Sequence, residues 1–157
     1  MKLRSAAMAL ATAVFPLALH AEDSMLKPIN PPNADIPGIS QAIVMPASAQ
    51  TMYLSGHVPF GANGVAKGDF AAQLDQVFAN MHATLQEAGT DFSSVARLTF
   101  YVVGYDGSQL DDLRNVRDRW INTETPPASA LIGVDALFHP DVLVEVDGIA
   151  FLLEDAK

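Results

Sequence analysis

The sequence of 157 residues contains no cysteine. This absence excludes disulfide bonds, zinc–thiolate sites and cysteine nucleophiles together, so the redox compartment has to be inferred from other features. Basic residues are also scarce: nine Lys and Arg stand against eighteen Asp and Glu, which gives a formal net charge of −9. Because binding to nucleic acid or to an anionic membrane surface needs a positive patch, both functions are disfavoured.

Repeats and low-complexity segments are absent as well, whereas half of the residues are hydrophobic and only 17% are charged. This composition is typical of one compact domain with a hydrophobic core. The three histidines beyond the N-terminal region, His57, His82 and His139, do not have the spacing of a metal site. We therefore predict neither a metal nor another cofactor.

The first 21 residues have the pattern of a secretory signal peptide. Lys2 and Arg4 precede an apolar stretch, residues 6–19, and Ala21 supplies a small residue for cleavage. The apolar stretch is short for a bilayer span of about 20 residues and contains Pro16, which disfavours a membrane anchor. We expect cleavage after Ala21, a periplasmic protein and no membrane association afterwards.

A single domain is predicted for residues 22–157, and it begins with an extended lead-in. Four prolines in residues 22–37 exclude a helix there. Two short runs rich in β-forming residues follow at 41–45 and 51–56, and their closeness predicts a β-hairpin. Glycines then indicate a loop that ends at Asp69, a good helix N-cap.

Residues 70–88 give the strongest periodic pattern, because apolar side chains recur every three or four positions. This pattern predicts a helix that ends at Gly89. A buried strand is predicted at 95–103, a second helix at 110–120, and two more strands at 129–134 and 142–153.

The resulting order, ββαβαββ, predicts an α+β domain with one mixed sheet and two helices on a single face. The other face of such a sheet needs a cover in a domain of this size. A homo-oligomer is therefore expected from the pattern alone.

Several ordered motifs resemble those of one known family. The strand-to-loop segment Tyr53-Leu54-Ser55-Gly56-His57-Val58-Pro59 is similar to its Ser-Gly-x-x-Pro motif. The following helix is similar to its Gln-x₆-Asn pattern, ending in Ala-Gly. In this chain the residues of that pattern are Gln73, Asn80, Ala88 and Gly89. Two later segments, Pro127–Ala130 and Val144–Ala150, are also similar to family motifs. Over residues 36–152 the chain thus resembles the RidA/YjgF family.

This resemblance implies a chorismate-mutase-like (YjgF-like) fold and a homotrimer whose sheets line a central barrel. It also implies three small-molecule clefts at the subunit interfaces, with hydrolysis of reactive enamines and imines as the activity. In that chemistry an arginine holds the substrate carboxylate in a bidentate clamp, while a glutamate and backbone groups position the attacking water.

The resemblance also implies the site residues of this chain. Glu145 matches the glutamate that positions water, and Ser129 stands where the family has its arginine, although a hydroxyl lacks the charge and the fork geometry. Leu131 replaces a frequent cysteine, and Ile39 is the nearest match to a frequent aromatic. The residues predicted to bind the ligand are Ser55, Gly56, Ser129, Ala130 and Leu131.

Two further predictions concern ionisable residues. His57, in the loop that the family places beside the cleft, is a candidate proton-transfer residue, and the alternative is an ordinary surface histidine. Asp147 points the same way as Glu145, which is consistent with an acid/base pair or with a solvated face. The arginines are either anion-binding residues or members of surface ion pairs: Arg97, Arg114, Arg117 and Arg119.

Two functions remain open at this point. One is an enzyme of the enamine/imine deaminase type with an altered substrate class and weak or absent activity on 2-imino acids, because Ser129 cannot clamp a carboxylate. The other is a non-catalytic trimer that binds a small metabolite. An endoribonuclease role is disfavoured by the negative charge and by export.

Overall fold

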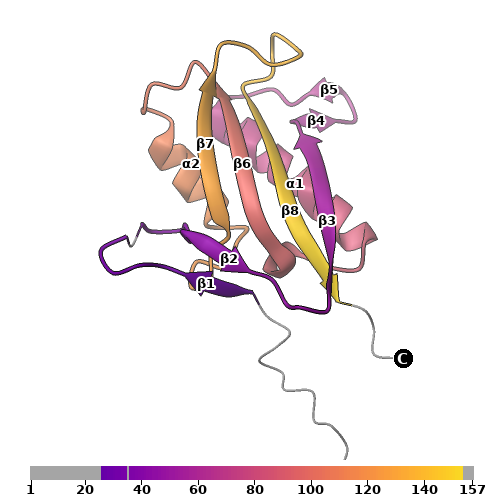
Figure 1. Cartoon of the computed structure of the whole chain (residues 1–157). Coiled ribbons are helices and arrows are strands. Elements are labelled where there is room, and N and C mark those ends of the chain that lie inside the picture. Colours follow the sequence, from indigo (N-terminus) through magenta and orange to yellow (C-terminus); the bar gives the residue numbers. More distant parts are fainter. Residues whose placement is uncertain (1–25, 35, 154–157) are drawn as a thin grey trace, which may run out of the picture.

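The computed structural model describes residues 26–34 and 36–153, so the expected signal peptide lies outside the described residues. Eleven elements follow one another along the chain (Figure 1). They are β1 (Lys27–Ile29), β2 (Ala42–Val44), β3 (Ala49–His57), β4 (Phe60–Gly61), β5 (Gly64–Val65), α1 (Phe70–Glu87), η2 (Phe92–Ser94), β6 (Val95–Val103), α2 (Leu110–Arg117), β7 (Ala128–Val134) and β8 (Val144–Leu153).

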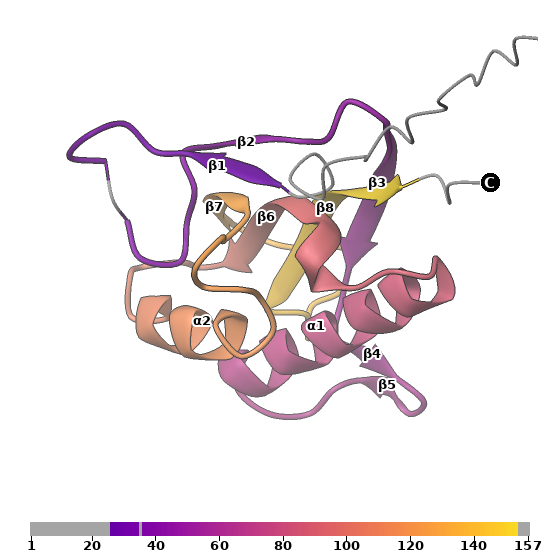
Figure 2. The same ribbon diagram turned by 90° about the horizontal axis from the view of Figure 1, so that it is seen from below.

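A four-stranded sheet with the order β3-β8-β6-β7 forms the centre of the fold. The β3–β8 and β6–β8 pairs are antiparallel, and the β6–β7 pair is parallel. Both helices lie on one side of this sheet, as the view from below shows (Figure 2). The structure confirms the predicted α+β fold, with two helices on one face of a mixed sheet.

Helix α1 forms where its periodicity places it. The Asp69 carboxylate accepts a hydrogen bond from the Ala72 N–H at 3.0 Å and so satisfies one of the free donors of the first turn. At the other end Gly89 adopts a φ of 77°, a conformation that glycine accepts without steric cost. The buried residues of the helix are Phe70, Gln73, Leu74, Val77, Phe78, Met81 and Leu85.

Helix α2 ends three residues before its predicted end at 120. The backbone continues in a tighter turn, in which the Trp120 N–H donates to the Arg117 carbonyl at 2.9 Å. This turn stacks the Trp120 indole on the Phe78 ring of α1, with ring centroids 6.1 Å apart. The predicted apolar face is therefore preserved although the helix is shorter.

The predicted hairpin between residues 41–45 and 51–56 is wrong. Strand β2 pairs with β1 from the lead-in, and β3 pairs with β8 at the far end of the sequence. The nine residues of β3 find a long antiparallel partner in β8, whereas β2 has only three residues to offer. Longer pairing with a distant strand thus prevails over pairing with the adjacent one. A short hairpin of β4 and β5 forms instead in the predicted loop.

The lead-in is held against the rest of the domain by a buried arginine. The Arg117 guanidinium, whose side chain is 3% exposed, pairs with Asp118 at 2.8 Å and donates to the Pro37 carbonyl at 3.4 Å. Ser40 donates to the Pro126 carbonyl at 2.6 Å and forms a bridge with Ala128. The expectation of a solvated surface pair is wrong for Arg117, because its side chain fills the space between α2 and the lead-in.

The hydrophobic core lies between the sheet and the helices. On β6 the side chains of Leu98, Phe100 and Val102 are at most 1% exposed, and Val144 and Val146 of β8 are fully buried. Burial of each such side chain contributes roughly 1.5 to 3 kcal/mol to folding. The alternation between buried and half-buried residues along β8 agrees with the predicted division of its two faces.

Candidate functional site

Glu145 and Gly56 are brought into direct contact. Glu145 lies near the start of β8, and Gly56 lies near the end of β3, where the β3–β8 pairing is irregular between Leu54 and His57. A Cβ atom on Gly56 would overlap with the Glu145 carboxylate. Glycine at this position therefore leaves the space that the carboxylate occupies.

The Glu145 carboxylate is only partly buried, and it makes no hydrogen bond or ion pair with any residue in 26–34 or 36–153. Its strand neighbour across the sheet is Tyr101 of β6. A carboxylate has lone pairs for about four hydrogen bonds. Its acceptor capacity is thus open to water or to a ligand donor.

Asp147 lies two residues further along β8 and shares the helix-free face with Glu145. It accepts a hydrogen bond of 3.0 Å from the Tyr101 hydroxyl. This bond is the main cause of the raised pKa of Tyr101, because the phenol would lose it on ionisation. Tyr101 therefore stays a neutral hydrogen-bond donor beside the two carboxylates.

His57 has both ring nitrogens engaged. Its Nδ1 lies 2.8 Å from the Ser55 carbonyl oxygen, and its Nε2 lies 2.9 Å from the Thr84 hydroxyl on α1. Since a carbonyl only accepts, Nδ1 must carry the hydrogen. When the ring is neutral, Nε2 accepts from the Thr84 hydroxyl, whose single hydrogen is shared with the Asn80 carbonyl at 3.2 Å. His57 pairs with the buried Val146 and so faces the helices, whereas Glu145 faces the other side of the sheet.

The three residues predicted to complete the cleft lie on β7, at the opposite edge of the sheet from β3. Ser129 pairs with Leu98 on the helix side, Leu131 packs against the hydrophobic core, and Ala130 pairs with Thr99. Two strands, β8 and β6, separate β7 from β3, which corresponds to about 14 Å at the usual strand spacing. One chain therefore does not bring Ser55 and Gly56 together with these residues.

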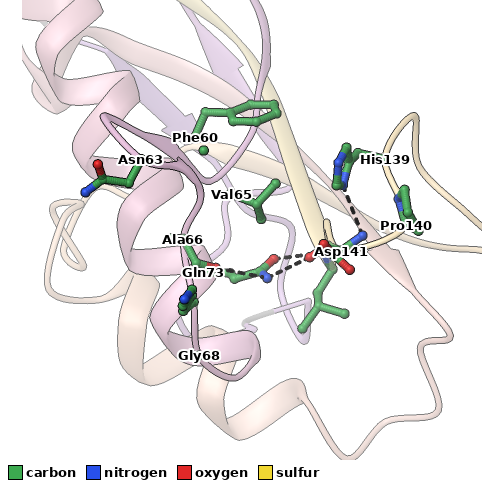
Figure 3. Close-up of a pocket in the computed structure, with 12 residues that line it drawn as sticks. Phe60, Asn63, Val65, Ala66, Gly68, Gln73, His139, Pro140 and Asp141 are labelled. Carbon is green, nitrogen blue, oxygen red and sulfur yellow. Dashed lines mark hydrogen bonds between the residues drawn. The ribbon is translucent and has the colours of Figure 1, made fainter.

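A hollow of about 680 Å³ beside the start of α1 was not predicted (Figure 3). Gln73 forms its floor: the amide donates to the Asp141 carbonyl at 2.8 Å and accepts from the Leu143 N–H at 2.9 Å. A third bond, of 3.4 Å, reaches the Ala66 carbonyl. The sequence signal for this hollow is a long polar side chain beside the core positions of the predicted helix. In the structure that side chain is buried, because Gln73 is only 4% exposed.

Residues 26–34 and 36–153 contain no cluster of three histidine, aspartate or glutamate side chains that could hold an ion. Within the same ranges, no helix is both long and apolar enough to span a bilayer.

Comparison with known proteins decides the family. Residues 34–152 match the family described as Endoribonuclease L-PSP, and this match extends over most of the chain. The chain belongs to the RidA/YjgF family. The RidA/YjgF domain thus includes every residue from the end of the lead-in to the penultimate residue of β8.

Relatives of this RidA/YjgF-family chain agree with that assignment. Protein DfrA of Myxococcus xanthus is 35% identical over 71% of this chain and 82% of its own length. A RutC family protein of Pyrococcus abyssi is 29% identical over 80% of this chain and 89% of its own.

Among solved structures, a Rid-family protein of unknown function from Yersinia pestis is 32% identical. Its TM-score is 0.70, with 81% of this chain and 98% of that chain covered. RidA from an Antarctic Psychrobacter is 28% identical with a TM-score of 0.60, over 83% and 95% of the two chains.

Proposed function

We propose that this RidA/YjgF-family chain forms a homotrimer whose inter-subunit clefts hydrolyse the C=N bond of a small imine, or of an enamine through its imine form, that carries no carboxylate. The observation that carries this proposal is the unpaired Glu145 carboxylate against Gly56. In this reaction water adds across the C=N bond, and the nitrogen leaves as ammonia.

Glu145 is suited to hold the attacking water. Its oxygens have no hydrogen-bond or ion-pair partner among the residues that the structure describes, and the glycine beside it lets a small molecule approach the backbone of β3 closely. A carboxylate within hydrogen-bond reach of a water can orient it and take up its proton. The Tyr101 hydroxyl, held as a donor by Asp147, is nearby on the same face.

The missing arginine argues for a neutral substrate. Ser129 has no charge, and its register with Leu98 directs it to the helix side of the sheet. A hydroxyl cannot replace the two parallel hydrogen bonds that a guanidinium makes with a carboxylate. We therefore expect 2-imino acids to be poor substrates.

Assembly of a homotrimer is supported by the separation of the two halves of the cleft. Strand β3 carries Ser55 and Gly56 at one edge of the sheet, and β7 carries residues 129–131 at the other. A second copy that places its β7 beside the first copy's β3 would complete the cleft. The helix-free face also exposes Tyr53 (79%) and Ile132 (42%), which is apolar surface suited to an interface.

A non-catalytic trimer that binds a small metabolite is the second candidate. It is favoured by His57, whose two ring nitrogens are already engaged with Ser55 and Thr84. With His57 facing α1, Glu145 lacks the second proton-transfer group that was expected from the sequence. Binding alone needs no such group.

Ammonia release from freshly generated 2-imino acids and from neutral imines separates these candidates. We expect turnover of neutral imines that is lost in Glu145→Ala and retained in Glu124→Ala, an exposed glutamate outside the cleft. Silence of the wild type on every substrate would instead favour the binding protein.

We further propose that the mature protein is periplasmic. The charged and apolar pattern of residues 1–21 supports this proposal. Mass spectrometry of the protein from its native cell envelope should give an N-terminus at Glu22. A protein that keeps Met1 and stays in the cytoplasm would contradict it.

A further inference from the structure

The hollow beside α1 lies apart from the cleft around Glu145, and none of its lining residues belongs to the predicted cleft. One wall is the β4–β5 hairpin, and the other is the loop that leads into β8 (Figure 3). Its volume of about 680 Å³ falls within the range of small-molecule sites, roughly 300 to 1,000 Å³. The hydrogen bonds of Gln73 tie both walls to α1, so the hollow is already formed without a ligand.

Aromatic side chains stand at its rim and remain exposed. The Phe60 ring is 39% exposed and lies 5.8 Å from the Phe138 ring, which is 67% exposed. The His139 ring packs within 6.3 Å of both. These rings come from the two walls and already contact one another, so together they offer one apolar surface against which a planar ligand can pack.

The polar groups of the lining include two donors. Lys67 lines the hollow, and its ammonium makes no ion pair within residues 26–34 and 36–153. His139 accepts the Asp141 N–H at its Nδ1, at 3.2 Å, which leaves Nε2 as the N–H donor. Both N–H groups of the Gln73 amide are already engaged, with the Ala66 and Asp141 carbonyls.

The charge of the lining limits the ligand. Lys67 is its only cation, and Asp141 is its only acid. One carboxylate on a planar ring matches both the single ammonium and the aromatic rim.

We propose that this hollow is a second binding site, independent of the cleft, for a small aromatic monocarboxylate. The ring packs against the contacting Phe60 and Phe138 rings, and the carboxylate meets Lys67 and the His139 N–H. The site stands whether or not the cleft is catalytic, because it shares no lining residue with it.

Titration calorimetry with 2-naphthoate tests this proposal on the purified protein. We expect saturable binding that weakens about tenfold in Lys67→Met, the change expected from loss of one charge-assisted hydrogen bond. Phe60→Ala and Phe138→Ala should each weaken it as well. The matched control is Lys27→Met, which removes an exposed lysine on β1. The uncharged 2-naphthylmethanol should bind about as weakly as 2-naphthoate binds to Lys67→Met.

Two results would overturn the site. One is the absence of saturable 2-naphthoate binding by wild-type protein whose thermal unfolding is cooperative. The other is binding that Glu145→Ala abolishes and that the Lys67 and Phe60 variants leave intact, because the ligand would then occupy the cleft. Chemical-shift changes confined to residues 60–68 and 138–143 would support the proposal even if Phe60→Ala failed to fold.

Discussion

The two faces of the four-stranded sheet are encoded by alternate residues of the same strands, yet they differ in burial and in polarity. On β6, Leu98 and Phe100 face the helices and are at most 1% exposed, whereas Arg97 and Tyr101 face the other side and remain accessible. On β8, Val146 is fully buried beside the half-buried Glu145. The helix-covered face determines the fold, and the open face is left free for assembly and chemistry.

The helix-covered face should dominate stability, and Phe100→Ala tests this. We expect a loss of about 3 to 5 kcal/mol in the free energy of unfolding, because a large cavity forms between the sheet and the helices. Denaturant unfolding measures it. Tyr53→Ala on the open face serves as control and should stay within about 0.5 kcal/mol at protein concentrations too low for assembly. Equal losses of unfolding free energy in Phe100→Ala and Tyr53→Ala would show that the two faces contribute equally to stability.

The open face should instead dominate activity, and Gly56→Ala is the sharpest probe of it. Its added Cβ would push the Glu145 carboxylate aside, so we expect the rate of imine hydrolysis to fall about a hundredfold, as for an ångström-scale misplacement. Gly61→Ala is a matched control, because a Cβ there meets no atom within 4 Å. If Gly56→Ala and Gly61→Ala hydrolysed imines at similar rates, Glu145 would have no role in the proposed reaction.

Assembly provides the next test of the open face. Ile132 is 42% exposed there, and an aspartate in its place would put a charge into the proposed interface. Sedimentation equilibrium should show the wild type as a trimer and Ile132→Asp as a monomer, a threefold loss of mass. A wild-type monomer at all concentrations would refute the trimer directly.

The outer side of the helices should matter least. The Trp120 indole N–H and Arg119 hold the pKa of Asp75 below its ordinary value of 3.8. A lowered carboxylate pKa contributes stability above the ordinary value, and this contribution is lost as pH falls through the lowered value. Because the Asp75 side chain is 47% exposed, Asp75→Asn should cost less than about 1 kcal/mol at neutral pH. Chemical denaturation near neutral pH should show the difference in unfolding free energy between the wild type and Asp75→Asn, and this difference should disappear well below pH 3.8. A difference that is the same at both pH values would contradict the stabilising role of the Asp75 carboxylate.

Local patterns in the sequence predicted the helices better than the strand pairing. Helix α1 carries its own cap, periodicity and terminating glycine, so Asp69 and Gly89 were sufficient to place it. The pairing of β2 and β3 depends on competition between partners at the two ends of the chain. No local pattern contains that information.

The sequence predicted which residues belong to the candidate site, but not how they are arranged in space. Glu145 and Gly56 could be named from motifs, whereas their contact depends on the irregular register of β3 against β8. The orientation of His57 towards Thr84 follows from the same irregularity, which shifts the pairing near its position. Such details arise only when strands distant in the sequence pair.

The position of β8 in the sheet has a consequence for how the chain reaches its native state. This strand comes last among the strands of residues 26–34 and 36–153, and yet it lies between β3 and β6 and pairs with both. Until residues 144–153 have left the ribosome, β3 has no partner in the central sheet. Folding of the sheet must therefore wait for β8 and should be slow, because the contacts of β8 with β3 are among the least local ones. Removal of β8 would leave β3 without a strand partner in this sheet and separated from the β6–β7 pair.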